Sequence, residues 1–140
     1  MSVRKSERSE GKLLVLEAMK ELTAYTLRIC SNEKVFPKKY RWVTTQKIVN
    51  TCLDAEVNIQ RANAIRVTYD MDYKIRRNCQ LEARADIYAL LALVDVSFRA
   101  FNIEPRRIEY WTGLIDKVDE YLNAWINADF KRYKDLIAGQ

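Results

Sequence analysis

Residues able to perform covalent or metal chemistry are few and scattered in this chain. Its 140 residues include no histidine, which excludes imidazole-based catalytic triads and histidine-containing metal sites. The three cysteines, Cys30, Cys52 and Cys79, lack any CxxC spacing. We therefore expect reduced thiols packed on helices, and neither a disulfide nor a zinc site. No glycine-rich loop is present to cradle a phosphate.

The carboxylates also argue against catalysis. Asp54 and Glu56 lie two residues apart and would point to different faces of a helix. Asp86 and Asp95 are each close to an arginine in the sequence, which favours solvated or interfacial salt bridges over general acid–base work. The sequence therefore predicts a non-enzymatic protein without a metal or cofactor.

A different chemistry is offered by the stretch FPKKYRWVTTQKIVN, residues 36–50. Residues 33–47 carry five cations against one carboxylate, in a chain of net charge +5. Lysine and arginine can neutralise phosphates, while tyrosine and tryptophan rings can stack on unpaired bases. In the alternative interpretation, Phe36, Tyr40 and Trp42 fasten the loop to the core while the cations stay hydrated. Composition alone favours this second interpretation.

Further cations precede and open a later helical segment. Arg61, Arg66, Lys74, Arg76 and Arg77 could share one end of a helical protein, and self-association could join such ends into a larger basic surface. The candidate nucleic-acid-binding residues are Lys38, Lys39, Arg41, Lys47, Arg61, Arg66, Lys74, Arg76 and Arg77.

The elements that must position these residues are predicted to be helices. With 49% hydrophobic and 31% charged residues, the chain is typical of one globular domain, and its three glycines and two prolines favour few, long elements. Thr44 or Thr45 could cap the second helix. The predicted helices span about residues 10–31, 44–66, 70–101 and 105–128, after a flexible charged tail at 1–9 and before an extension at 129–140 that either prolongs the last helix or lies loose.

Each predicted helix carries an apolar stripe that recurs at intervals of three and four residues, and the connections are short. This pattern predicts an all-α, antiparallel up-down four-helix bundle. The stripes comprise Val15, Ala18, Met19, Leu22, Tyr25 and Ile29; Ile48, Cys52, Ala55, Ile59 and Ala62; Ile87, Leu91, Val94, Phe98 and Phe101; and Ile108, Trp111, Ile115, Val118, Leu122 and Trp125.

The third predicted helix has a second apolar stripe, formed by Leu81, Ala85, Tyr88, Ala92 and Val96. A bundle of this size encloses one interior. The second stripe therefore indicates either a partner subunit, which favours a cyclic oligomer, or a central helix that is buried on all sides.

Residues 36–63, FPKKYRWVTTQKIVNTCLDAEVNIQRAN, resemble the Avd-like four-helix-bundle family, the accessory variability determinants of diversity-generating retroelements. Two features depart from the family pattern: Asn123-Ala124 replaces glycines before the late tryptophan, and the chain continues further beyond Asp129. The residues that carry the resemblance are Phe36-Pro37, the basic and aromatic run 38–41, Gln46, Asn50, Asp54 and Ala62-Asn63, with Tyr110 and Trp125 in the last helix.

The resemblance implies a non-enzymatic partner of a reverse transcriptase. It further implies a pentameric, barrel-like assembly whose basic surface binds template RNA or DNA during mutagenic retrohoming. Given this resemblance, we interpret the basic and aromatic stretch of residues 36–50 as functional and not only structural.

A second resemblance leads to a different function. VTTQKIV, residues 43–49, faintly resembles a stretch in the four-helix-bundle proteins encoded within ribosomal intervening sequences. That relation implies a structural or interaction oligomer with no nucleic-acid role.

Neither interpretation involves a membrane, because no apolar run approaches about 20 residues. The start of the chain lacks a signal-peptide pattern, and we expect a cytoplasmic protein.

Overall fold

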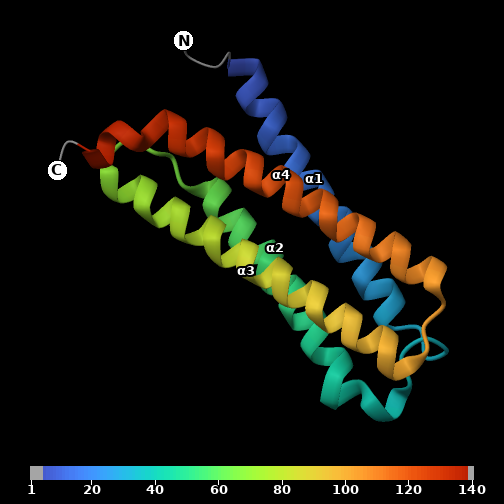
Figure 1. Ribbon diagram of the computed structural model, residues 1–140. Helices are drawn as coiled ribbons and strands as arrows, with labels where there is room; N and C mark the ends of the chain where they lie inside the picture. The colour runs from blue at the N-terminus through green and yellow to red at the C-terminus, as the bar shows by residue number, and fades with distance from the viewer. Residues whose placement is uncertain (1–4, 139–140) are drawn as a thin grey trace.

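The computed structural model describes residues 5–138 of the chain, with side chains described for residues 11–137 (Figure 1). Within that part the protein is all-helical and has no strand, which confirms the predicted all-α class. Four long helices form the bundle: α1 (Lys5–Cys30), α2 (Gln46–Ala64), α3 (Asp70–Phe101) and α4 (Pro105–Ala138). Two short helices, η1 (Lys38–Tyr40) and η2 (Arg41–Thr45), connect α1 to α2.

The core is built from the predicted stripes. All stripe residues of α1 and α4 are buried except Tyr25 and Ile108, which pack against the core from its edge, and all those of α2 are buried. These predictions are confirmed. Trp111 is fully buried, and its Nε1 donates a hydrogen bond to Thr26 Oγ1 at 3.0 Å, which joins α4 to α1.

Side-chain contacts show which helices lie side by side. Arg84 Nη1 of α3 donates to Asn123 Oδ1 of α4 at 3.2 Å. Asn58 Nδ2 of α2 donates to Asp86 Oδ2 of α3 at 2.9 Å. Figure 1 shows α2 beside α3 and α4 beside α1 along much of their length. The helices that contact each other are thus α2 with both α1 and α3, and α4 with both α1 and α3.

The ends of the chain differ from the prediction. α1 begins at Lys5, so residues 5–9 of the expected tail are helical, while residues 1–4 lie outside the described part. α4 continues without a break to Ala138. Of the two alternatives for the C-terminal extension, prolongation of the last helix is therefore the one observed through residue 138; residues 139–140 are outside the described part.

The predicted cap of α2 was wrong. The Thr45 side chain makes no capping hydrogen bond, and Thr44 Oγ1 donates to Tyr40 O at 3.3 Å. The backbone N–H of Gln46 already bonds to Arg41 O across the wide turn of η2. Because η2 leads directly into α2, the helix start does not need a side-chain acceptor.

Of the two alternatives for the second apolar stripe of α3, burial of the helix on all sides within one chain is not observed. Ile87 and Val94 face the core, but Tyr88 is 51% exposed and Val96 is 54% exposed. Leu91, predicted in the core stripe, lies at the surface, and the neighbouring Leu90 is buried instead. The second apolar stripe of α3 therefore faces outward from the single chain at four positions, Ala85, Tyr88, Ala92 and Val96, whereas Leu81 packs against the core. That it meets a partner subunit stays a prediction.

Candidate nucleic-acid interface

Aromatic packing holds the segment between α1 and α2 against the turn between α3 and α4. Phe36 is only 2% exposed, and its ring centroid lies 5.8 Å from that of Phe101 and 6.0 Å from that of Trp111. The Tyr40 ring packs on Phe101 at 5.2 Å. These contacts gather cations from several elements at one end of the bundle, here called the cationic end: Arg28, Lys34, Lys38, Lys39, Arg41, Lys47, Arg106 and Arg107.

Trp42 behaves differently from the other two aromatic residues. It is 77% exposed, and Val43 beside it is 72% exposed. Among the residues of η2, only Thr45 is buried. The interpretation that all three rings fasten the loop was therefore right for Phe36 and Tyr40 and wrong for Trp42.

The predicted cations of this segment are accessible. Lys38, Lys39, Arg41 and Lys47 are all exposed. Arg41 Nη2 lies 3.6 Å from Glu33 Oε1 in an exposed ion pair. Such pairs contribute little free energy, so a phosphate can compete for this guanidinium.

Sequence analysis did not single out Arg28, Arg106 and Arg107 at the same end. All three are exposed. The pKa of Tyr25 is raised by burial, while the charges of Arg107 and Arg28 oppose that shift. Tyr25 Oη also donates to Arg107 O at 3.4 Å, which places Arg107 beside this tyrosine. Arg106 and Arg107 directly follow Pro105, a residue favoured in the first turn of a helix. The sequence could therefore have placed both arginines at the start of the last helix.

A groove of about 320 Å³ lies beside Trp42, between the last turn of α1 and the start of α2. Burial raises the pKa of the Cys30 thiol to about 12, so this thiol stays protonated at neutral pH and is not a nucleophile. All three cysteines are free, as predicted. The groove is lined by Leu27, Cys30, Ser31, Arg41, Trp42, Thr45, Gln46 and Val49.

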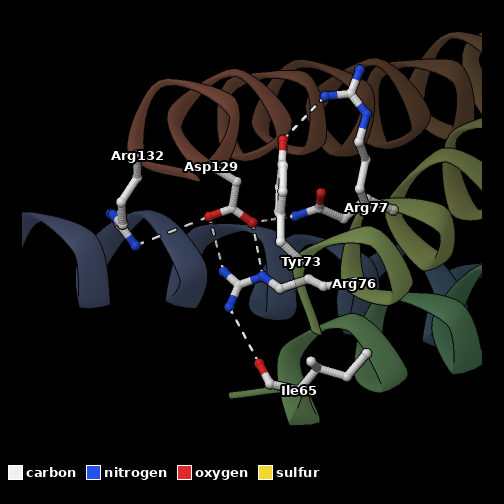
Figure 2. A network of polar contacts seen from close by, with 7 residues as sticks. Ile65, Tyr73, Arg76, Arg77, Asp129 and Arg132 are labelled. Carbon is white, nitrogen blue, oxygen red and sulfur yellow. Dashed lines mark hydrogen bonds and ion pairs between the residues drawn. The ribbon is translucent and has the colours of Figure 1, made fainter. Parts of the chain in front are cut away.

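Arg76 does not fit the predicted binding role. It is 2% exposed, its Nε lies 2.7 Å from Asp129 Oδ2, and its Nη2 donates to Asp129 Oδ1 at 3.0 Å (Figure 2). The guanidinium also lies 5.1 Å from the centre of the Trp125 ring. A buried, paired guanidinium cannot reach a polyanion at the surface. The prediction that Arg76 binds nucleic acid was therefore wrong.

Other groups complete the network around Asp129. Gln80 Nε2 donates to Asp129 Oδ2 at 2.9 Å, and Arg132 Nη1 lies 4.0 Å from Oδ1. Partial burial lowers the pKa of Lys12, the charge of Arg76 lowers it further, and Asp129 opposes both effects. One buried carboxylate thus faces several cations where α1, α3 and α4 meet.

Spacing was the signal that could have revealed this network. Arg76 and Gln80 extend the core stripe of α3 backward from Ile87 through Ala83, at intervals of three and four residues. Asp129 follows Trp125 by four residues on the core face of α4. Polar residues at core positions of two neighbouring helices predict a buried ion pair.

The remaining predicted residues lie away from the cationic end. Lys74 is exposed and pairs with Asp70 at 3.8 Å, and Arg77 Nη1 donates to Tyr73 Oη at 3.1 Å. Lys74 is the fifth residue of α3, whereas Phe101, which contacts the cationic end, is its last residue. At 1.5 Å per residue these positions are about 40 Å apart. Within one chain, the cationic end is therefore separate from the second basic cluster, which comprises Arg66, Lys74 and Arg77.

Arg61 lies in an acidic setting, and Arg66 is exposed beyond the end of α2. Arg61 lines a second groove, between α2 and α3, together with Asp54, Glu82 and Asp86. Burial raises the pKa of Asp86, and the charges of Asp54 and Glu82 raise it further, while Asn58 opposes the shift. Carboxylates around Arg61 repel phosphate, so this arginine is the weaker candidate.

Metal-binding clusters and membrane-spanning helices are both absent from the described residues. Within residues 5–138, no group of three His, Cys, Asp or Glu side chains is arranged to hold a metal ion. None of the helices in that range has both the length and the apolar character required to span a membrane.

Comparison with known proteins gives no match, either to a protein-family model or to a curated protein. The relation to the Avd-like family therefore stays a prediction that depends on the residues quoted for it.

Proposed function

We propose that this protein is a non-enzymatic accessory subunit that holds nucleic acid at its cationic end and works with the reverse transcriptase of a diversity-generating retroelement. The observation that carries the proposal is Trp42, exposed next to Arg41 and flanked along the chain by Lys38 and Lys47. An indole exposed among cations is a favourable combination for binding single strands. The reverse transcriptase partner and a pentameric assembly come from the family resemblance.

The proposal includes an antiparallel up-down arrangement of the helices. Its support is the order of contacts between α3 and α4, where Arg76 meets Asp129 and Arg84 meets Asn123. Residue numbers rise along one helix while those of their partners fall along the other. In this arrangement both connections at the cationic end belong to one surface.

The chemistry of such binding is electrostatic and weakly selective. Exposed lysines and arginines release counterions from the nucleic acid, so affinity falls steeply with salt. If several subunits each presented a cationic end, their individually weak phosphate contacts would act together and raise the affinity for nucleic acid. A surface of this kind retains a template without reacting with it.

A second candidate function is a structural or interaction oligomer without a nucleic-acid role. The outward apolar stripe of α3, with Tyr88 and Val96 more than half exposed, favours self-association under either function. The two functions differ in one measurable property, which is salt-sensitive retention of nucleic acid.

The test is titration of labelled single-stranded RNA and DNA at several sodium chloride concentrations. The combined change Lys38→Gln, Lys39→Gln and Arg41→Gln is expected to weaken binding and to reduce the slope of log K against log salt by about 2, since each lost phosphate contact contributes about 0.7. Helicity, followed by circular dichroism, is expected to stay unchanged because these side chains are exposed.

A matched variant controls for total charge. Lys20, Lys117 and Lys131 are exposed on α1 and α4 away from the η1–η2 segment, so their conversion to glutamine should change the slope much less. The combination Arg66→Gln, Lys74→Gln and Arg77→Gln tests the second cluster in the same way. Binding that is absent, or insensitive to salt, would exclude the nucleic-acid role. The retroelement role also requires a reverse transcriptase gene with template and variable repeats beside the coding region.

A further inference from the structure

The groove beside Trp42 has apolar and hydrogen-bonding surface that the binding of phosphates alone would not require. Leu27 and Val49 provide apolar surface, and the Trp42 indole stands at the groove with most of its surface open to solvent. Ser31 and Gln46 add polar groups on the same lining. The groove thus combines an aromatic face with hydrogen-bonding capacity.

Thr45 provides an independent observation: one buried polar group of the groove lacks a hydrogen-bond partner. This residue is 6% exposed and lines the groove, and its Oγ1 has no hydrogen-bond partner among the described residues. A buried hydroxyl without a partner costs free energy, and such groups call for an explanation in a native structure. A ligand that carries both a ring face and polar edges would satisfy it.

The charge around the groove indicates the chemistry of the occupant. No carboxylate lines it, and Arg41 belongs to its lining. Lys38 of η1 and Lys47 in the first turn of α2 lie within five residues of Trp42. An apolar side chain of a protein partner would fill the groove but leave the Thr45 hydroxyl and the Gln46 amide without partners. A nucleobase offers an aromatic face and polar edges and brings phosphates to the rim.

We propose that this groove accepts one unpaired base of a single-stranded nucleic acid, stacked on Trp42, with the adjoining phosphates on Arg41 and its neighbouring lysines. The inference depends on the proposed nucleic-acid role and adds the ligand class and its binding mode. A paired base is not available for insertion unless it is first taken out of its stack. The site therefore selects single strands over duplexes.

The test compares two DNA strands of equal length and phosphate number, one with bases and one built from abasic sites. The base-bearing strand is expected to bind at least about fivefold more tightly at the same salt concentration, because one base–aromatic stack contributes that factor or more. Trp42→Ala is expected to abolish this ratio while both strands keep their salt-dependent binding. A duplex of the same sequence is expected to bind more weakly than the single strand.

Intrinsic fluorescence gives a second readout. Trp111 and Trp125 are buried, so quenching of tryptophan emission by the base-bearing strand would report Trp42. The same quenching should be absent with the abasic strand and in Trp42→Ala. Ser31→Leu, which fills the groove from its exposed edge without adding a ring or a charge, is also expected to lower the ratio. Val43→Ala removes exposed apolar surface one residue away and should leave it unchanged.

The outcomes separate this inference from the proposed function. Equal, salt-dependent binding of both strands to the wild-type protein would overturn the base site while the polyanion-binding role stands. Equal losses for both strands in Trp42→Ala, or equal affinity for single strand and duplex, would overturn it as well. Failure of both strands to bind would overturn the nucleic-acid role itself, and the base site with it.

Discussion

Asp129 is a buried carboxylate with polar partners on two helices. It is 1% exposed and accepts hydrogen bonds from Arg76 and Gln80. Withdrawal of two opposite charges from water costs several kcal/mol for each ion, and the pair is stable only because each charge faces the other with additional hydrogen bonds. Loss of one partner is therefore far more costly than loss of both.

Asp129→Asn is expected to lower the free energy of unfolding by about 3–5 kcal/mol, because the Arg76 guanidinium would remain buried without a counter-ion. Urea denaturation measures the change. Arg132→Gln should cost less than about 1 kcal/mol, since this arginine is partly exposed and 4.0 Å from the carboxylate. The paired change Arg76→Met and Asp129→Leu should recover most of the loss. Equal effects of Asp129→Asn and Arg132→Gln would contradict the assignment.

Asp72 offers a pH-dependent test at the start of α3. Its Oδ2 accepts hydrogen bonds from the backbone N–H of Tyr69 at 2.9 Å and of Thr68 at 3.1 Å, which lowers the pKa of Asp72 in the folded state. A carboxyl group with a lowered folded pKa stabilises the protein above its unfolded pKa of about 3.9, and this contribution is lost as pH falls through the folded value.

Asp72→Asn is therefore expected to destabilise the protein near neutral pH and to become indistinguishable from wild type in strong acid. Thermal unfolding of both proteins over a pH series measures the difference in stability directly. The other carboxylates are the same in both proteins, so their contributions to this difference cancel. A difference that stayed constant down to the lowest pH would show that the charge of Asp72 does not stabilise the helix start.

At the scale of elements, the single wide turn of η2 determines which side chains reach solvent. It follows the packing of Phe36 and Tyr40 on Phe101 and joins α2 without a break. One extra residue in a helical turn changes the direction of the side chains around it, and such turns are frequent at functional sites. Trp42 is exposed and Thr45 is buried within this one turn.

The C-terminal part of α4 is predicted to be essential for stability, although it extends beyond the predicted bundle. A chain ending after residue 128 would lose Asp129 and the Tyr133 ring, which packs 5.4 Å from that of Tyr73. Because Arg76 would be left unpaired, we expect a loss of at least about 3 kcal/mol in the free energy of unfolding. Circular dichroism with urea measures it.

The matched control is a chain ending after residue 134. It keeps Asp129, Arg132 and Tyr133, so its stability should lie within about 1 kcal/mol of wild type. Similar losses in the two truncated chains would mean that the length of the helix, and not the buried ion pair, provides the stability.

At the scale of the whole molecule, charge and apolar surface occupy different places. The cationic end lies about 40 Å along α3 from the second basic cluster, while the outward stripe with Tyr88 and Val96 lies on α3 between them. Under the proposed function, this separation would let one face bind further copies while the end remained open to nucleic acid.

Light scattering is expected to report a mass several times that of one chain. Tyr88→Ser combined with Val96→Ser should reduce that mass without loss of helicity, because both residues are already solvent-exposed in the single chain. Val43→Ser, at the cationic end, should leave the mass unchanged. A wild-type protein that remains monomeric at all concentrations would exclude self-association through this face.

The sequence by itself determined the four helices and most of their core faces. Helical periodicity is a local property, and the stripes through Leu22, Ile59 and Trp111 were readable from spacing alone because each helix must bury one face. The concentration of cations around residues 33–47 was likewise a property of the sequence.

Only the tertiary structure decided which of these residues are available to a partner. Arg76 is buried because Asp129, 53 residues later, lies opposite it, and a one-dimensional pattern does not specify that pairing. Trp42 is exposed because Phe36 and Tyr40 are held by Phe101, more than 60 residues away. Exposure of a side chain depends on contacts between distant segments, whereas the tendency to form a helix depends mainly on neighbours in the chain.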